Sequence, residues 1–161
     1  MTMSNYPGGF TDGVLIRGLP LVQTHPGKVF WVSNASAAQL TGHRTGSNGN
    51  QGTFNDPFST LDYAFDQCTA SRGDVIFVKP GHAETISTAA ILDFDKAGVA
   101  VIGLGTGSLR PTFTYTTAIT ATIDVTAANI SIQNCLFVAN FLDVSSFFTF
   151  TTAKDFAVEN C

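Results

Sequence analysis

Two stretches of the sequence resemble each other, TIDVTAANISIQNC at residues 122–135 and FTFTTAKDFAVENC at residues 148–161. Both alternate apolar or aromatic residues with polar ones and then end in Asn-Cys. The second Asn and Cys each follow the first by 26 residues. Alternation of this kind is typical of half-buried β-strands. The constant offset therefore indicates an internal repeat built from strands.

The repeat continues towards the N-terminus with other offsets. Residues 92–94 and 99–103 align with residues 123–125 and 130–134 at an offset of 31, and residues 75–77 align with 99–101 at an offset of 24. Short strands that recur about every 20 to 50 residues are typical of a solenoid or propeller, in which one unit cannot bury its apolar face alone. The units lack a helical pattern, which favours a β-helix.

One amphipathic helix is predicted before these strands. Apolar residues recur with helical spacing at positions 61, 64, 65 and 68, which predicts one apolar helix face. Ser59 with Asp62 resembles a capping box, and the helix should end near Ser71 to Gly73, because glycine is a common stop signal. A helix in this place would cover the open end of the first unit.

The order of these features resembles a known family. The short helix, the strand segments at 73–81 and 98–105, and the paired Asn134 and Asn160 resemble right-handed parallel β-helix proteins of the pectate-lyase-like superfamily, which includes many phage tailspikes and other virion proteins. The resemblance covers about residues 53–161. It implies an all-β fold, a right-handed parallel β-helix (solenoid) with an N-terminal capping α-helix, to which the turn signals of the first residues add an extended N-terminal arm. It implies little about chemistry, because one fold hosts many functions.

We expect three regions along the chain: an extended arm at 1–40, a flexible Gly-rich linker at 41–54, and the capping helix with the β-helix coils at 55–161. Turn signals such as Pro7-Gly8-Gly9 interrupt the arm, which would lie on its own domain or reach another subunit. Its candidate attachment residues are apolar or aromatic: Tyr6, Phe10, Leu15, Ile16, Leu19, Phe30 and Trp31. Since Cys161 ends a coil without a covering segment, we expect a longer protein or a partner that covers this coil.

The composition narrows the classes of partner. Charged residues make up 12% of the chain, the net charge is -4 and the pI is about 5.1, which argues against binding to nucleic acid. No apolar run is long enough for a transmembrane helix, and the N-terminus has no signal-peptide pattern. We therefore expect a soluble protein made in the cytoplasm, with no membrane partner and no cofactor.

The paired Asn-Cys ends are expected to be structural. The alternation places Ile130, Ile132, Phe156 and Val158 inside, so Asn134 and Asn160 would stack at a turn and form an amide ladder. Cys135 and Cys161 would then lie about 5 Å apart, close enough for a disulfide. We favour reduced thiols, because free cysteine is among the most buried residue types.

The last unit leaves one question of orientation open. At an offset of 26, Phe148 and Phe150 point outward, whereas an offset of 25 turns them inward, because a one-residue slip exchanges the faces of a strand. Large aromatic residues are usually buried, so we favour the inward orientation. In the outward orientation, Phe147, Phe148 and Phe150 would form an exposed interface.

The candidate chemistry is sparse. Asp93 and Asp124 align at an offset of 31 and could begin a Ca²⁺ site or an acid/base pair. The resemblance implies a basic residue in the same groove, for which Arg110 is the candidate. The next unit carries Phe150 in the place of the aspartates, and His82 has no nucleophile at a definable distance. We therefore expect solvated aspartates, a turn histidine, no catalytic residue and no metal site.

These observations, with the resemblance, predict a non-enzymatic bacteriophage virion structural protein located in the virion. It would be a capsid decoration protein, a head fibre or a tail fibre/spike module, attached through its N-terminal arm. The resemblance implies a homotrimer, and the other partners would be virion proteins such as the major capsid protein or tail components. The alternative is a polysaccharide-binding or polysaccharide-degrading β-helix that uses the groove near Asp93, Asp124 and Arg110.

Overall fold

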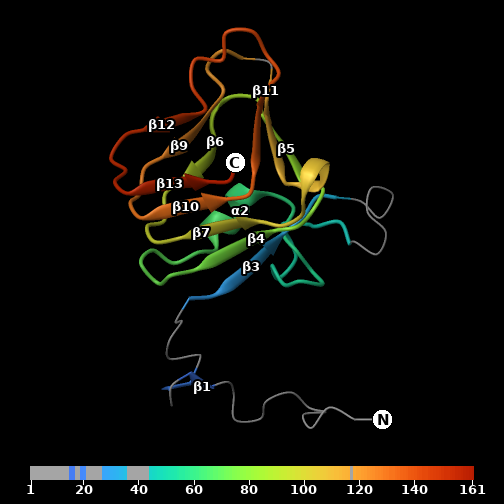
Figure 1. Ribbon diagram of the computed structural model, residues 1–161, viewed down its shortest axis with the longest axis vertical. Coiled ribbons are helices and arrows are strands. Elements are labelled where there is room, and N and C mark those ends of the chain that lie inside the picture. The colour runs from blue at the N-terminus through green and yellow to red at the C-terminus, as the bar shows by residue number, and fades with distance from the viewer. Residues whose placement is uncertain (1–14, 17–18, 21–26, 36–43, 117) are drawn as a thin grey trace.

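A computed structural model describes residues 15–16, 19–20, 27–35, 44–116 and 118–161. Nearly all of its regular structure is strand (Figure 1). The elements are β1 (Leu15–Ile16), β2 (Leu19–Pro20), β3 (Val29–Val32), α2 (Leu61–Asp66), β4 (Val75–Val78), β5 (Ala83–Ile86), β6 (Ala89–Phe94), β7 (Ala100–Gly103), the 3-10 helix η1 (Gly107–Leu109), β8 (Thr112–Tyr115), β9 (Thr122–Val125), β10 (Ile130–Gln133), β11 (Leu136–Ala139), β12 (Phe148–Phe150) and β13 (Phe156–Glu159).

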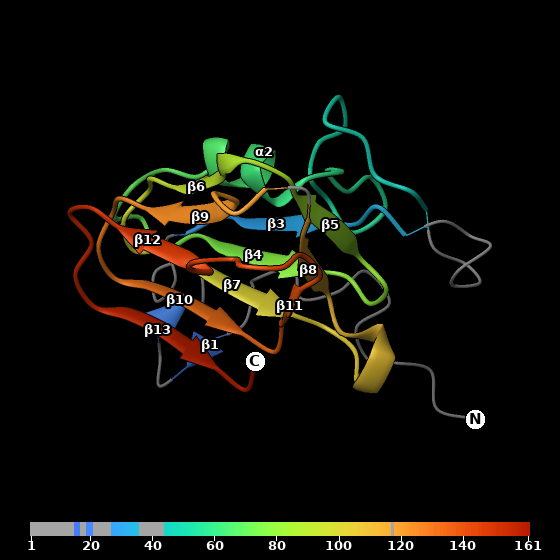
Figure 2. The ribbon, with the colours of Figure 1, turned by 90° about the horizontal axis from the view of Figure 1, so that it is seen from above.

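Three separate parallel sheets make up the body of the protein. Their strand orders are β13-β10-β7-β4-β3, β11-β8-β5 and β12-β9-β6. From β4 to β13 the chain visits the three sheets in turn, so β4 to β6, β7 to β9 and β10 to β12 form three successive units (Figures 1 and 2). The predicted all-β class is confirmed, and the parallel sheets are compatible with a β-helix-like fold.

The strand registers test the predicted offsets. Ile130 pairs with Phe156, which confirms the offset of 26, and Asp93 pairs with Asp124, which confirms the offset of 31. The offset of 24 is wrong, because β4 pairs with β7 at an offset of 25, with Ile76 opposite Val101. Both of these side chains are fully buried, and the true register brings them together on the inner face.

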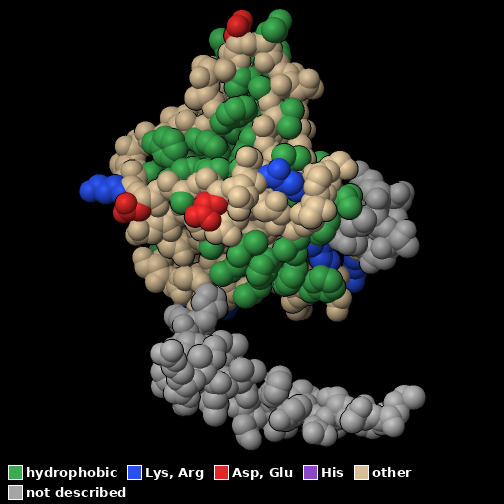
Figure 3. Space-filling model, in the orientation of Figure 1, with side chains coloured by type: hydrophobic (Ala, Val, Ile, Leu, Met, Phe, Trp, Pro, Cys, Tyr) green, Lys and Arg blue, Asp and Glu red, His purple; other side chains and the backbone are tan. Residues whose placement is uncertain are grey.

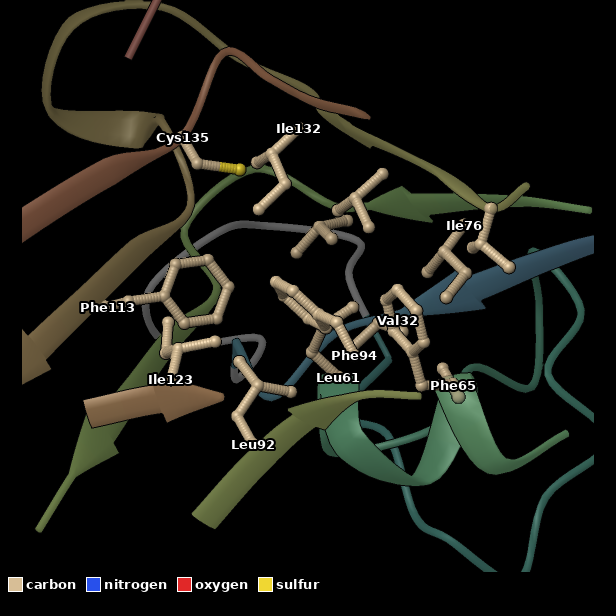
Figure 4. Close-up of a cluster of buried hydrophobic side chains, with 14 of the residues drawn as sticks. Val32, Leu61, Phe65, Ile76, Leu92, Phe94, Phe113, Ile123, Ile132 and Cys135 are labelled. Carbon is tan, nitrogen blue, oxygen red and sulfur yellow. The ribbon is translucent and has the colours of Figure 1, made fainter. Parts of the chain in front are cut away.

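The core lies between the sheets (Figure 4). Inward residues of successive strands stack in register, for example Ile76, Val101 and Ile132. Phe65 of α2 stacks on Phe94 of β6, with ring centroids 4.5 Å apart. Because strand alternation sends every second side chain inward, the sheets share one apolar interior.

The predicted helix is confirmed, but its bounds differ. Thr60, not Ser59, is the N-cap, and its side chain accepts a hydrogen bond from the Tyr63 backbone N–H. The helix ends at Asp66, several residues before the predicted stop at Ser71 to Gly73. The helix contacts β3, β4 and β6, the first strands of two sheets, so its apolar face adds to the core at that end (Figure 2).

Part of the predicted arm belongs to a sheet. Phe30 and Trp31 lie in β3, which pairs in parallel with β4, and Trp31 stacks on Phe77 with ring centroids 4.9 Å apart. Val32 is fully buried. Of the other predicted attachment residues, Leu15, Ile16 and Leu19 fall in the antiparallel pair β1 and β2, while Tyr6 and Phe10 lie outside the described residues.

The described part of the predicted linker, residues 44–54, is packed against β3 and the start of α2. The Trp31 N–H donates to the Gly52 carbonyl, and the Gly46 N–H donates to the Ser33 carbonyl. A Cβ atom at Gly46 would come within 2.2 Å of Ser33 O, so only glycine fits this close backbone approach. Glycine here serves packing, and the prediction of a flexible linker is wrong for these residues.

Candidate functional site

The predicted aspartate pair does assemble. Asp93 of β6 lies directly opposite Asp124 of β9, and Thr149 follows on β12. The Thr126 hydroxyl donates to Asp93 at 3.2 Å, and the Thr122 hydroxyl donates to Asp124 at 3.1 Å. Burial, together with the nearby Asp95 and Asp124, raises the pKa of the Asp93 carboxyl despite the Thr126 hydrogen bond. Each carboxylate thus accepts a hydrogen bond from a threonine, Thr126 directly after β9 for Asp93 and Thr122 in β9 for Asp124.

Arg110 does not join these aspartates. Its Nη2 donates to the Cys135 carbonyl at 2.8 Å and also to the Asn160 carbonyl. These carbonyls follow β10 and β13, at a different corner of the molecule from β6 and β9 (Figure 1). The predicted groove of Asp93, Asp124 and Arg110 is therefore not assembled. Within the described residues, no group of three or more His, Cys, Asp or Glu side chains could hold a metal ion.

The Asn134 and Asn160 corner is stacked, but it is not an amide ladder. Both residues have a positive φ, 56° and 53°, which asparagine tolerates better than most residues. The Asn134 amide donates to the carbonyls of Gly103 and Gly105, at 2.8 and 3.0 Å. These bonds direct the amide N–H groups of Asn134 to the preceding unit, and the described residues show no side-chain hydrogen bond between Asn134 and Asn160, so the predicted amide ladder is not formed.

Cys135 and Cys161 meet at the same corner as free thiols. The Cys135 backbone N–H lies 3.4 Å from Cys161 Sγ. Cys135 is buried and Cys161 is exposed. Burial raises the pKa of the Cys135 and Cys68 thiols to about 12, and it keeps both in the unreactive protonated form near neutral pH.

Iodoacetamide at pH 8 is expected to label Cys161 at least about tenfold faster than Cys68 or Cys135, because labelling needs an accessible thiolate. Peptide mass spectrometry after short exposures would measure the three rates. In urea, all three cysteines should react at similar rates. Equal rates for Cys135 and Cys161 in the native protein would contradict the buried position of Cys135.

The strand register decides which way Phe148 and Phe150 of the last unit point. β12 pairs with β9 at an offset of 25, with Phe148 opposite Ile123 and Phe150 opposite Val125. Both rings therefore face inward, as predicted, and Phe148 packs near Phe156 with ring centroids 5.2 Å apart. Phe150 is nevertheless 54% exposed, because no strand beyond β12 covers it in the described chain.

The apolar outer face of the five-stranded sheet was not predicted from the sequence. Its outward residues on β3, β4 and β7 are all apolar: Val29, Trp31, Val75, Phe77, Ala100 and Ile102. We call these six residues the outer face. Figure 3 shows hydrophobic side chains gathered over this part of the sheet. The sequence signal for this face is the pair of unbroken apolar runs VFWV and VIFV, because a strand that is buried on both faces does not alternate apolar and polar residues.

A partly open cavity of about 300 Å³ lies between α2, β5 and β6. Two carboxylates, Asp62 and Glu84, line it. Glu84 accepts a hydrogen bond from the Leu61 N–H at 2.9 Å, and Asp62 accepts one from the Asp93 N–H at 3.1 Å. Burial and the neighbouring carboxylates raise the pKa of Asp62, although the Asp93 N–H opposes this shift.

His82 lies behind this cavity. Its side chain is fully buried, its Nδ1 accepts from the Asn34 N–H at 3.0 Å, and its Nε2 lies 3.4 Å from Glu84 Oε2. Nδ1 is thus used as an acceptor, whereas Nε2 has no hydrogen-bond partner in the described residues. His82 is therefore a buried residue beside Glu84, and no pattern in the sequence indicates this contact.

The comparisons with protein-family models, curated proteins and solved structures found no match for this chain. In the described residues, no helix is long and apolar enough to cross a bilayer.

Proposed function

We propose that this protein is a non-enzymatic structural component of a bacteriophage virion: a capsid decoration protein, a head fibre or a tail fibre/spike module. In this proposal its three parallel sheets form a right-handed parallel β-helix of the pectate-lyase-like kind. The cyclic visit to three sheets by β4 to β13 supports this fold, and parallel crossovers are nearly always right-handed. The residues before β3 would attach it to the particle.

The observation that carries the proposal is the outer face. A sheet face in contact with water is normally polar, whereas this one presents Trp31, Phe77 and Ile102 in adjacent strands. Tryptophan and phenylalanine are enriched at protein interfaces, and charged residues are depleted at their centres. The occupant we propose is a second and third copy of the same chain, in a homotrimer.

Self-association needs a surface that does not repel its own copy. The outward positions from β3 to β10 carry no charge, and the first charged one in the five-stranded sheet is Glu159 on β13. Contact between two copies of the outer face therefore brings no like charges together. It also removes apolar surface from water, which stabilises the contact by about 25 cal/mol per Å² of buried apolar area. A rod of this kind can serve as a rigid spacer on a particle.

The polysaccharide alternative has less support. Its acidic pair is present, but Arg110 is bound to two backbone carbonyls elsewhere, and the aspartates are held by Thr122 and Thr126. Incubation with acidic polysaccharides, with and without Ca²⁺, would test this alternative. Release of unsaturated products or reducing ends, lost in Asp124→Ala, would favour it over the structural role.

The trimer is tested by light scattering of the purified protein. The expected mass is three times the 17.0 kDa of the chain. Phe77→Ser should convert the trimer to a monomer, because it places a polar hydroxyl in the outer face, while circular dichroism stays unchanged. The matched control is Phe147→Ser, which changes a partly exposed phenylalanine outside the outer face and should leave the trimer intact.

A monomer at high concentration would contradict the trimer, and dissociation by Phe147→Ser alone would place the interface at the last unit. An antibody to this chain, viewed on purified particles by electron microscopy, tests the virion assignment separately. Labelling at regular positions on the particle supports it, and particles without any label would refute it.

A further inference from the structure

The cavity between α2, β5 and β6 lies apart from the outer face and is not used by the proposed assembly. We propose that this cavity binds a primary ammonium group on an aliphatic chain, as found in a lysine side chain or a free alkylamine. Its volume of about 300 Å³ lies at the lower end of the range of small-molecule pockets. A single short aliphatic chain with its ammonium group fits this volume.

The charge of the cavity favours a cation. Asp62 and Glu84 both line it, and neither lies within ion-pair distance of a lysine or arginine in the described part of the chain. The other charged groups that act on Asp62 are Asp66, Glu84 and Asp93, all acidic. A concave site lined by one sign of charge concentrates ligands of the opposite sign.

Glu84 occupies an unusual position in the fold. Its register partners in the next two units are Phe113 and Phe137, so a carboxylate replaces an aromatic ring on an inward position. A buried carboxylate costs free energy unless it is well hydrogen-bonded. The Leu61 N–H satisfies one oxygen, and His82 Nε2 lies 3.4 Å from the other without a hydrogen-bond partner of its own.

These contacts fix the carboxylate before any ligand arrives. The Leu61 N–H donates to one Glu84 oxygen, and the Asp93 N–H donates to Asp62. His82 Nε2 lies 3.4 Å from the other Glu84 oxygen without a hydrogen bond. A site whose groups are already oriented loses less entropy on binding. The hydrogen bond from the Leu61 N–H accounts for Glu84 at the start of the helix, but it gives no structural role to the open volume beside the two carboxylates.

The apolar side of the cavity favours an aliphatic chain next to the ammonium group of the ligand. Ile86, Ile91 and Leu92 line the same cavity, and Ile91 is 42% exposed. An aliphatic chain would cover this surface while its ammonium group reaches the two carboxylates. A bare divalent metal ion fits less well, because the described residues offer no group of three metal ligands.

The test is titration of ¹⁵N-labelled full-length protein with pentylammonium chloride at pH 7 and constant ionic strength. The backbone N–H groups of Leu61 and Asp93 donate to the two carboxylates, so their amide signals are direct reporters. We expect saturable shifts with a dissociation constant on the order of 1 mM, as befits a ligand of very few atoms. Pentanol, which has the same chain without the charge, should produce no saturable shift of these signals.

Two near-isosteric variants remove the charge and keep the hydrogen-bond acceptors. Asp62→Asn and Glu84→Gln should each weaken pentylammonium binding by about tenfold or more, since each removes a charge partner of the ammonium group. The control is Glu159→Gln on an exposed position of β13, away from the cavity, which should leave binding within about twofold. Unchanged binding in both cavity variants, or equal shifts with pentanol, would overturn the proposal.

The source of the ammonium group is distinguished by a second titration with Nα-acetyl-lysine amide. Binding about tenfold tighter than that of pentylammonium would indicate a lysine of a partner protein, because the added peptide groups then contribute. Equal binding would indicate a free alkylamine. These titrations do not depend on the oligomeric state, so the assembly proposal and the cavity proposal can fail separately.

Discussion

Phe94→Ala is expected to lower the free energy of unfolding by about 3–5 kcal/mol, the usual cost of removing a buried phenylalanine. Phe94 is fully buried, it stacks on Phe65 of α2, and it lies in register with Val125 of the next unit. The alanine would leave a cavity between the helix and two units (Figure 4). Urea unfolding followed by circular dichroism would measure the loss.

The matched control is Phe150→Ala. Phe150 lies in register with the same Val125, from the opposite side, but it is 54% exposed. Its removal should cost less than about 1 kcal/mol in the isolated protein, because little apolar area returns to water. A cost equal to that of Phe94→Ala would mean that a partner covers the last unit in solution, and it would contradict the exposed position.

Asp74→Ala is expected to destabilise the protein by about 3–5 kcal/mol, the typical cost of breaking a buried ion pair. The Asp74 side chain is fully buried and accepts four hydrogen bonds, from Arg72 Nε and Nη2 and from the backbone N–H groups of Lys28 and Thr69, all between 2.6 and 2.8 Å. It joins the start of β3 to the segment before β4. Asp95→Ala, which breaks the partly exposed pair with Lys96, should cost less than about 1 kcal/mol.

The Asp74 carboxylate should also make the free energy of unfolding depend on pH. Burial by itself would raise the pKa of Asp74, but the hydrogen bonds and the charge of Arg72 outweigh it and lower the pKa below 3.8. A lowered pKa in the folded state gives stability that is present above the unfolded value and is lost as pH falls through the folded value. The stability difference between wild type and Asp74→Asn should therefore be constant near neutral pH and shrink below about pH 4. A difference that does not change with pH would contradict the ionised state of Asp74.

The repeat was readable from the sequence where both strands of a pair keep the same alternation. The offset of 26 between β10 and β13 and the offset of 31 between β6 and β9 follow from side chains with the same inward pattern. The predicted offset between β4 and β7 is wrong by one residue, because VIFV is apolar at every position and fits two registers equally well. Local alternation cannot fix a register when both faces of a strand are apolar.

The candidate sites depended far more on tertiary contacts. Sequence spacing predicted the stack of Asp93 on Asp124, since both are strand residues in one sheet. Arg110 lies in the corner before β8. Its side chain donates hydrogen bonds to the carbonyls of Cys135 and Asn160, which are 25 and 50 residues away in the sequence. The cavity joins Asn34, Asp62 and Glu84 from three separate segments. No local sequence pattern predicts that these three residues line one cavity, because their proximity depends on the path of the loops between strands.

The sequence by itself determined the all-β class, the parallel repeat, the helix before it and the inward alternation of the later strands. These features follow from local periodicity, which is set by the backbone geometry of strand and helix. Only the tertiary structure decided that Phe30 and Trp31 belong to a sheet, that residues 44–54 pack against it, and that Glu84 faces a cavity. Each of these depends on contacts between residues far apart in the chain, whose stabilisation appears only when the sheets pack together.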